Sequence, residues 1–374
     1  DVCSSDLIEA AEQALRRIAE KLRTPLVVLD HNITVSASIG LSVYPDHSQD
    51  PATLLRNADL AMYHAKEHGK NGWHTYVPEL GAGMLRRMSI EKALETAVDN
   101  GELELHYQAQ VDFSGRFSGV EALLRWHNPQ LGEVAPTTFI PLAEESGLIV
   151  PIGAWVLDQA CNQAAAWLKA GFAVQRMAVN ISARQLVQVG FLEAVQSALQ
   201  RSGLSPDCLE LELTETALMY DLEHCMRRLQ SLRTLGVTVA IDDFGTGYSS
   251  LCYLQKLPVN RVKIDQSFVK GISAASGGTL PLVRSIIDLA HSLDLTVVAE
   301  GVETPKQFEA LCRAGCDQMQ GFMIHRPQPA SEVLRAFHRS VSGLAPQVNV
   351  LRYSPDLRMD SAGSPQGISS QSIV

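Results

Sequence analysis

Polar side chains recur at the ends of apolar, strand-like runs through the second part of the chain. They are Glu121, Asn180, Glu212, Asp242, Asp243, Lys263, Glu300 and Gln320. If these strands are parallel and close into a barrel, their carboxyl ends meet on one face and the side chains converge there. Several carboxylates cannot stay charged together without a counter-ion, and carboxylate and amide oxygens are the ligands that Mg²⁺ and Mn²⁺ prefer. The pattern therefore predicts a site for divalent cations.

Each of these positions also has an ordinary explanation when it is taken alone. A strand-end glutamate such as Glu121 commonly caps a helix or joins an ion pair, and Asn180 suits a turn. A single Lys263 would usually be solvated. The pair Asp242 and Asp243 is more suggestive, because adjacent acids after an apolar run repel one another unless a cation binds. The prediction of a site rests on the recurrence of all these residues in one register.

The elements that position these residues alternate between strands and helices. Strand-like runs lie at 103–111, 117–126, 177–182, 209–215, 237–245, 261–265, 295–301 and 319–323. Amphipathic stretches such as 191–203, 225–236 and 282–294 lie between them. This alternation predicts a parallel sheet, and its length favours an α/β fold of the TIM-like (β/α)8 barrel type. A short Ser-Gly-Arg turn at 114–116 joins the first two runs, which predicts one antiparallel strand.

Two further segments flank the expected barrel. Helical spacing at 7–22, strand-like runs at 25–30 and 33–44, and a helical pattern at 52–69 indicate a truncated α/β domain at residues 1–78. A helix expected at 84–99 links it to the barrel, which we place at residues 85–340. Residues 343–374 are rich in Ser, Gly and Pro, and we expect them to form a disordered tail.

Composition narrows the class of protein. A chain of 374 residues with 46% hydrophobic and 19% charged side chains can build a sizeable core, and its net charge of −10 argues against binding a nucleic-acid polymer. The seven cysteines form no CxxC pair and favour a reducing cytosol, so we expect a cytoplasmic protein. The chain begins at Asp1 without Met, so a missing upstream sensor region, or membrane attachment of a longer protein, stays an open alternative.

The strand-like runs also carry a family resemblance. The motifs are EALLRW at 121–126, TFIPLAEESGLI at 138–149, VNIS at 179–182, LELTE at 211–215, IDDFGTGYSSL at 241–251, VKID at 262–265, AEGVE at 299–303 and QGF at 320–322. Together they resemble the EAL domain family of cyclic di-GMP phosphodiesterases. An ordered set of site residues is a stronger argument for function than a shared fold.

The resemblance implies metal-dependent hydrolysis of cyclic di-GMP to linear pGpG, with two Mg²⁺ or Mn²⁺ ions. It implies that one ion is held by Glu121, Asn180, Glu212 and Asp242, and that Asp242 bridges to a second ion held by Asp243 and Glu300. Two such ions can clamp the attacking and the leaving oxygen of a phosphodiester. Lys263 would orient the attacking water, and Glu300 would serve as general base.

Substrate contacts are implied in the same way. Arg125 suits a forked contact to a phosphate, and Gln108 and Gln320 would contact the nucleotide. The family commonly has Tyr-Gln-Pro where this chain has Tyr107, Gln108 and Ala109. The missing proline loosens the strand end and leaves the pose of Gln108 open, but it removes no ligand.

The segment DFGTGYSS at 243–250 has two interpretations. Its glycines permit unusual backbone angles, so it could be a simple surface turn. In the resembling family, however, this loop couples the metal site to dimerisation and is anchored by a glutamate that matches Glu215. The resemblance thus implies a homodimer formed through the barrel. The residues that would couple the loop to it are Glu215, Asp243, Phe244, Gly245, Thr246 and Gly247.

Residues 33–76 resemble the C-terminal half of a GGDEF diguanylate cyclase domain. The GG(D/E)EF turn is absent from the chain, so we expect no synthesis of cyclic di-GMP by this segment. Lys66 and Lys70 match positions that contact nucleotide phosphate in that family. We favour the simpler interpretation that both are solvated cations near a helix C-terminus, where the helix dipole attracts them.

Two other functions compete with hydrolysis of cyclic di-GMP. The barrel could be a non-catalytic receptor for cyclic di-GMP, or an enzyme that acts on another phosphoester. All of the ligand positions and Glu300 are retained, which favours catalysis over a receptor. The EALLR and DDFGTGYS motifs favour cyclic di-GMP over another phosphoester.

Overall fold

The computed structural model describes residues 4–22, 26–28, 31–33, 37–67, 72–172, 174–219, 222–246, 254–272, 278–333 and 335. The chain divides into two compact units between Thr96 and Ala97. Lys70, Gly247 and the expected tail at 343–374 lie outside the described residues. Within the described part of the chain, no helix is long and apolar enough to span a bilayer.

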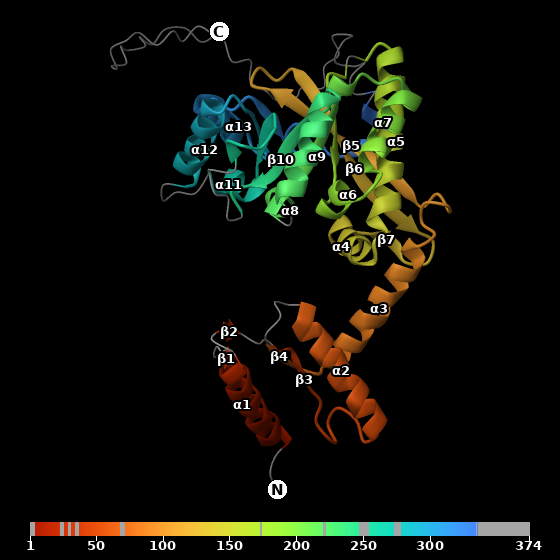
Figure 1. Ribbon diagram of the computed structural model, residues 1–374, viewed down its shortest axis with the longest axis vertical. Helices are drawn as coiled ribbons and strands as arrows, with labels where there is room; N and C mark the ends of the chain where they lie inside the picture. The colour runs from red at the N-terminus through yellow and green to blue at the C-terminus, as the bar shows by residue number, and fades with distance from the viewer. Residues whose placement is uncertain are drawn as a thin grey trace, which may run out of the picture. The chain divides into compact units, whose positions relative to one another are not determined.

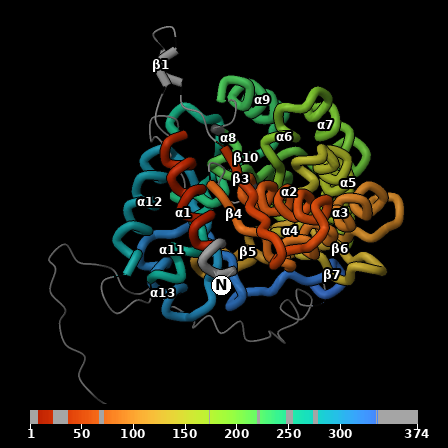
Figure 2. The backbone as a smooth tube through the Cα atoms, turned by 90° about the horizontal axis from the view of Figure 1, so that it is seen from below, coloured from red at the N-terminus to blue at the C-terminus, as the bar shows by residue number. Residues whose placement is uncertain are grey.

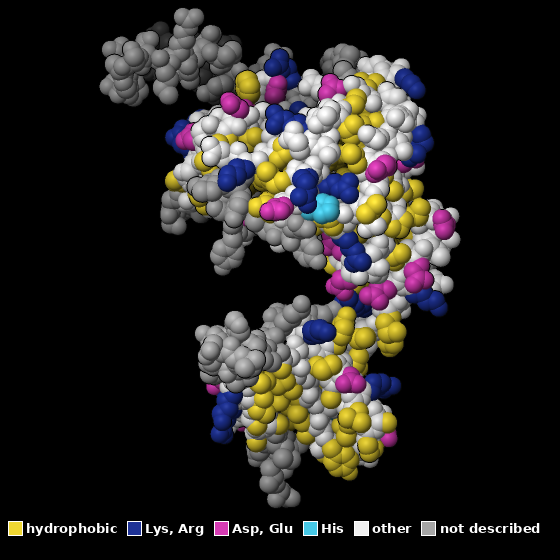
Figure 3. Space-filling view, in the orientation of Figure 1, with side chains coloured by type: hydrophobic (Ala, Val, Ile, Leu, Met, Phe, Trp, Pro, Cys, Tyr) yellow, Lys and Arg dark blue, Asp and Glu magenta, His cyan; other side chains and the backbone are white. Residues whose placement is uncertain are grey.

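The N-terminal unit is a small α/β assembly with two separate sheets. Its elements are α1 (Ser4–Leu22), β1 (Leu26–Val28), β2 (His31–Ile33), β3 (Ile39–Leu41), α2 (Pro51–Glu67), β4 (Trp73–Thr75) and α3 (Pro78–Leu94). Strands β1 and β2 pair antiparallel, and β3 and β4 pair parallel. Two-stranded sheets cover little apolar surface. Hydrophobic side chains accordingly gather on the visible face of this unit in Figure 3, and Leu55, Leu85 and Met88 are exposed.

Helix α3 begins earlier than the sequence pattern predicted. It spans Pro78–Leu94, whereas we expected a helix at 84–99. Pro78 occupies the first turn, where its fixed φ angle suits a helix start and its missing N–H costs nothing. The apolar spacing used for the prediction marks the buried face of a helix and not its first residue.

The second unit is a closed eight-stranded barrel (Figure 1). Its strand order is β5-β13-β12-β11-β10-β9-β8-β6, and β6 pairs again with β5. Their bounds are β5 (Leu103–Asp112), β6 (Phe117–Asn128), β8 (Met177–Asn180), β9 (Leu209–Thr214), β10 (Thr238–Phe244), β11 (Arg261–Ile264), β12 (Thr296–Ala299) and β13 (Gln318–Gln320). These are the eight predicted runs. Strand β5 is antiparallel to both of its neighbours, which confirms the antiparallel strand inferred from the short turn.

Helices surround the barrel and two short strands extend it. Figure 2 places α5, α7, α9 and α12 around the strands. The helices are α4 (Pro136–Ser146), α5 (Ile149–Lys169), α6 (Ala183–Val187), α7 (Phe191–Ser202), η1 (Pro206–Cys208), α8 (Glu215–Met219), α9 (Leu222–Thr234), α11 (Gln266–Gly271), α12 (Leu280–Ser292) and α13 (Pro305–Ala314). The short strands are β7 (Gly132–Val134) on β6 and β14 (Gln328–Pro329) on β5.

The interior of this barrel is polar, whereas TIM barrels usually fill it with branched apolar side chains. Alternate residues of β9 and β11 supply buried charges, namely Glu210, Glu212, Arg261 and Lys263. The residues between them, such as Leu211 and Val262, are also buried but are apolar. Because successive strand residues point to opposite faces, the apolar set meets the helices and the charged set lines the inside.

Gly321 directly follows β13 and lies against the backbone of Val302. A Cβ atom at this position would lie 2.2 Å from both the backbone nitrogen and the backbone oxygen of Val302. That approach accompanies a hydrogen bond from the Val302 nitrogen to the Gln320 oxygen at 3.0 Å. Gly321 therefore fixes the backbone that carries Gln320.

We expect Gly321→Ala to lower the free energy of unfolding of the barrel by about 1–3 kcal/mol, because the added methyl group must displace backbone. Thermal unfolding followed by circular dichroism measures this loss. Gly83→Ala is the control, since Gly83 lies in α3 with open space around its Cα and alanine favours helices. Equal melting temperatures for Gly321→Ala and the parent chain would contradict the close approach.

Candidate active site

One buried ammonium group lies at the centre of the barrel mouth. The side chain of Lys263 on β11 is 1% exposed, and its Nζ lies 2.6 Å from Glu300 Oε1 and 2.7 Å from Glu212 Oε2. It also lies 3.1 Å from Asp242 Oδ2 and 3.7 Å from Glu121 Oε1. Four carboxylates from four segments thus share one cation.

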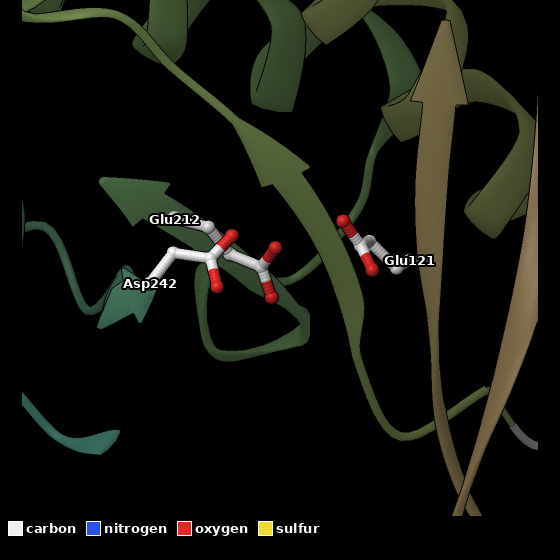
Figure 4. A group of neighbouring side chains, drawn as sticks. All are labelled: Glu121, Glu212 and Asp242. Carbon is white, nitrogen blue, oxygen red and sulfur yellow. The ribbon is translucent and has the colours of Figure 1, made fainter. Parts of the chain in front are cut away.

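Two groups of three carboxylates form around this lysine. Glu121, Glu212 and Asp242 offer oxygens that all lie within 4.8 Å of one another, and Asp242, Asp243 and Glu300 do the same. Figure 4 shows the first three carboxylates pointing toward one another. Asp242 belongs to both groups, which is the arrangement that a bridging ligand between two ions requires.

Consecutive residues of a strand normally face opposite sides, yet Asp242 and Asp243 both reach the site. The backbone explains this, because Asp243 adopts a left-handed φ of 53° and the β10–β11 register shifts between Ile241 and Phe244. Such an irregularity redirects a side chain at the end of a strand. The Asp243 nitrogen also donates to Asp242 Oδ1 at 2.9 Å, which orients that carboxylate.

Burial and repulsion shift the pKa values of several acids in this site. Burial raises the pKa of Glu300 to about 8, although Lys263 opposes the shift. Burial also raises the pKa of Asp243 to about 6, and the neighbouring carboxylates of Asp242 and Asp265 add to it. The pKa of Glu212 lies well above its ordinary value because burial outweighs the attraction of Lys263. Added positive charge would therefore stabilise the ionised acids.

The pKa of Glu121 shifts in the opposite direction to those of Glu300, Asp243 and Glu212. Burial alone would raise its pKa, but Lys263 and the amides of Gln320 and Asn180 lower it overall. Asn180 Nδ2 donates to Glu121 Oε1 at 2.7 Å, and Gln320 Nε2 donates to Glu121 Oε2 at 2.5 Å. The amide oxygen of Asn180 is left as the atom that can ligate a metal.

The donor set fits hard divalent cations. All of the ligating atoms would be carboxylate or amide oxygens, and Glu212 Oε1 is buried without a hydrogen-bond partner among the described residues. The structure thus brings together all of the residues predicted as metal ligands: Glu121, Asn180, Glu212, Asp242, Asp243 and Glu300. Their individual roles remain predictions.

A pocket of about 220 Å³ opens over this cluster. Gln108, Gln320 and Glu300 line it, as a substrate site would require. Arg125 is half-buried and donates to the Leu124 carbonyl at 2.9 Å, and its predicted phosphate contact stays a prediction. It shares the inward face of β6 with Glu121 because the two are separated by an even number of residues.

Several site residues were not predicted from the sequence. Gln266, Glu303 and Phe322 line the pocket, and the carboxyl of Asp265 lies beside Asp243. Asp265 and Glu303 both occur inside motifs that we used, VKID and AEGVE. The position of Asp265 directly after β11 was the available signal for it.

The loop after β10 is anchored from a neighbouring strand end. The Gly245 nitrogen donates to Glu215 Oε2 at 3.2 Å, and Thr246 Oγ1 donates to the Asp243 carbonyl at 2.8 Å. Glu215 begins α8 and is buried. Phe244, the residue before Gly245, is also buried. The predicted anchor between Glu215 and this loop is therefore present in the structure.

Replacing Lys263 by Met tests whether the carboxylates need a counter-charge. Removal of one partner leaves buried charges uncompensated, so Lys263→Met in EDTA should lower the free energy of unfolding by about 3–5 kcal/mol. Addition of a divalent cation should restore part of the loss. Denaturant unfolding with and without the cation measures both effects. The exposed Lys169→Met is the control. If Lys263→Met lowered the free energy of unfolding equally with and without the cation, the carboxylates would not need a counter-charge.

The chain has similar relatives among curated proteins. Residues 91–327 match the family model described as EAL domain, and residues 2–72 match diguanylate cyclase, GGDEF domain. The bifunctional diguanylate cyclase/cyclic di-GMP phosphodiesterase MucR of Pseudomonas aeruginosa is 43% identical over 334 residues, 88% of this chain and 49% of MucR. Cyclic di-GMP phosphodiesterase PdeR of Escherichia coli is 37% identical over 339 residues, 90% of this chain and 51% of PdeR. The chain thus spans about half the length of these relatives.

Solved structures resemble the barrel as well. PaMucR phosphodiesterase in complex with cyclic di-GMP has a TM-score of 0.63 and 46% identity, over 66% of this chain and 99% of that chain. The EAL enzyme Bd1971 with cAMP and cyclic di-GMP bound has a TM-score of 0.64 and 32% identity, over 76% of each chain. EAL phosphodiesterases are metal-dependent, and the two carboxylate groups described above could bind metal. Since the EAL domain match covers more than half of the sequence and its motif residues meet at one site, the chain belongs to the EAL domain family.

Proposed function

We propose that this chain hydrolyses cyclic di-GMP to linear pGpG with two Mg²⁺ or Mn²⁺ ions. The observation that carries the proposal is the pair of carboxylate groups that share Asp242 around the buried Lys263. Relatives that share the EAL domain are named cyclic di-GMP phosphodiesterases, and a similar structure holds cyclic di-GMP. A receptor would need the pocket but not this concentration of buried acids.

The residues divide the work of the reaction between them. Bound divalent cations would supply a water of lowered pKa and neutralise charge on the phosphate. Lys263 lies within 3.1 Å of Glu212, Asp242 and Glu300, so it holds their carboxylates in place and can orient a water between them. Glu300 borders the pocket and can accept the proton of that water. Gln108 and Gln320 line the same pocket and would contact the nucleotide.

Incubation of purified protein with cyclic di-GMP and Mg²⁺ or Mn²⁺, followed by chromatography for pGpG, tests the proposal. EDTA should stop the reaction. We expect Glu300→Ala to lower turnover by about 10²–10⁴-fold while cyclic di-GMP still binds, because a general base acts in the transition state. Glu309→Ala, which removes an exposed glutamate on α13, should match the parent. Binding without hydrolysis by the parent chain would instead identify a receptor.

The proposal extends to a homodimer formed through the barrel. The contact between Glu215 and Gly245 links α8 to the loop that follows the two aspartates, so movement of the loop would reach the metal ligands. A partner barrel that contacts this loop would then favour the active arrangement. The proposal also includes a cytoplasmic location and a sensor region upstream of this chain.

We expect Glu215→Ala to reduce both the dimer fraction and the turnover, the latter by about tenfold, because the Gly245 backbone N–H loses its charged acceptor. Glu215→Gln keeps an oxygen acceptor and should retain most of both. Light scattering after size exclusion gives the mass of each variant. A parent chain that is monomeric at assay concentrations, or an Ala variant that keeps full activity, would argue against coupling through this loop.

A further inference from the structure

A directed chain of buried amides lies next to Glu121. Gln110 Nε2 donates to Gln320 Oε1 at 2.9 Å, and Gln320 Nε2 donates to Glu121 Oε2 at 2.5 Å. Gln320 Nε2 also donates to Gln108 Oε1 at 2.9 Å, and Gln108 Nε2 donates to the His325 carbonyl at 2.8 Å. All three glutamines are buried, and Gln110 is 0% exposed.

The two ends of this chain fix its direction. The His325 carbonyl and an ionised Glu121 carboxylate can only accept hydrogen bonds, so Gln108 and Gln320 must present Nε2 to them. Gln320 Oε1 then faces Gln110, which must donate. A reversed Gln110 amide would place two oxygens against each other. Gln110 Oε1 has no hydrogen-bond partner among the described residues. The side chain of Gln110 therefore contacts Gln320 through its Nε2 group.

Gln110 is set back from the pocket. Gln108 and Gln320 line the pocket, whereas Gln110 is not among its lining residues. Across the β5–β6 pair it lies opposite Gly119, where a Cβ atom would come within 3.3 Å of Gln110 Oε1. The glycine thus leaves room for the amide. Any effect of Gln110 on the site must pass through Gln320.

We propose that Gln110 is a positioning residue that holds the Gln320 amide in the orientation in which it donates to Glu121. Glu121 Oε2 is then committed to Gln320, and Oε1 is directed toward Asn180, the side on which a metal would bind. Without Gln110 the oxygen of Gln320 loses its hydrogen-bond donor, so the amide is held only through its nitrogen and can swing away from Glu121. The inference rests on the proposed metal site and adds a residue that touches neither metal nor substrate.

Binding of Mn²⁺ to the metal-free full chain, measured by calorimetry, tests the inference without turnover. Gln110→Met keeps the length and burial of the side chain but removes the donor, and we expect Mn²⁺ to bind about tenfold more weakly. In a Gln320→Met background the same change should alter Mn²⁺ affinity by less than about twofold, because the hydrogen bond between Gln110 and Gln320 is already lost. Gln110→Asn, an amide one methylene too short, should weaken binding similarly and serves if the Met variant does not fold.

Asn128→Ala is the matched control. Asn128 is a buried amide on the neighbouring strand β6, and it donates to Glu102 Oε2 at 2.8 Å, outside the amide chain. Its loss should lower stability and leave Mn²⁺ affinity unchanged.

Affinity within about twofold of the parent in Gln110→Met, or losses that multiply in the double variant, would overturn the inference. A parent chain that binds Mn²⁺ with this coupling but does not hydrolyse cyclic di-GMP rejects only the proposed function. A parent that binds no Mn²⁺ rejects both.

Discussion

The active site depends on the burial of Lys263 among the carboxylates of Glu121, Glu212, Asp242 and Glu300. A buried charge costs several kcal/mol unless it is paired, and one ammonium cannot balance four acids. The fold therefore concentrates negative charge that further cations can neutralise. Burial, with added repulsion from Asp242 and Glu121, raises the pKa of Glu300, and Asp242 belongs to both carboxylate groups that could bind metal.

Buried charged side chains also pair with one another in the barrel interior below the pocket. Arg261 and Arg176 each approach Glu210 Oε2, at 3.5 Å and 3.4 Å, and Arg261 also donates to Gln318 Oε1 at 2.7 Å. Burial lowers the pKa of Arg261 to about 10, although Glu210 opposes the shift. This lower layer pairs two arginines with Glu210, while the upper layer around Lys263 holds an excess of carboxylates. Strands β9 and β11 each carry one residue of the lower layer, Glu210 or Arg261, and one residue of the upper layer two positions further along the strand, Glu212 or Lys263.

Much of the fold and site follows from patterns within single strands. Apolar runs predicted all eight barrel strands, and the polar residues at the ends of most runs predicted which side chains meet at the mouth, because the carboxyl ends of parallel strands converge. Contacts that depend on register between strands were missed, and the amide chain from Gln110 to Gln320 is the clearest case. The family resemblance placed Asp243 among the metal ligands, but strand alternation alone would turn its side chain away, and the left-handed φ that brings it to the site was not predicted. Helix α3 was misplaced because periodicity ignores the proline start.

Anomalous X-ray diffraction from crystals of the chain soaked in Mn²⁺ tests the central claim most directly. The account predicts two Mn²⁺ peaks about 3.5–4 Å apart with the Asp242 carboxylate between them. Glu121, Asn180 and Glu212 should contact one ion, and Asp243 and Glu300 the other. An absence of peaks at the barrel mouth, or a single ion bound away from Asp242, would contradict it.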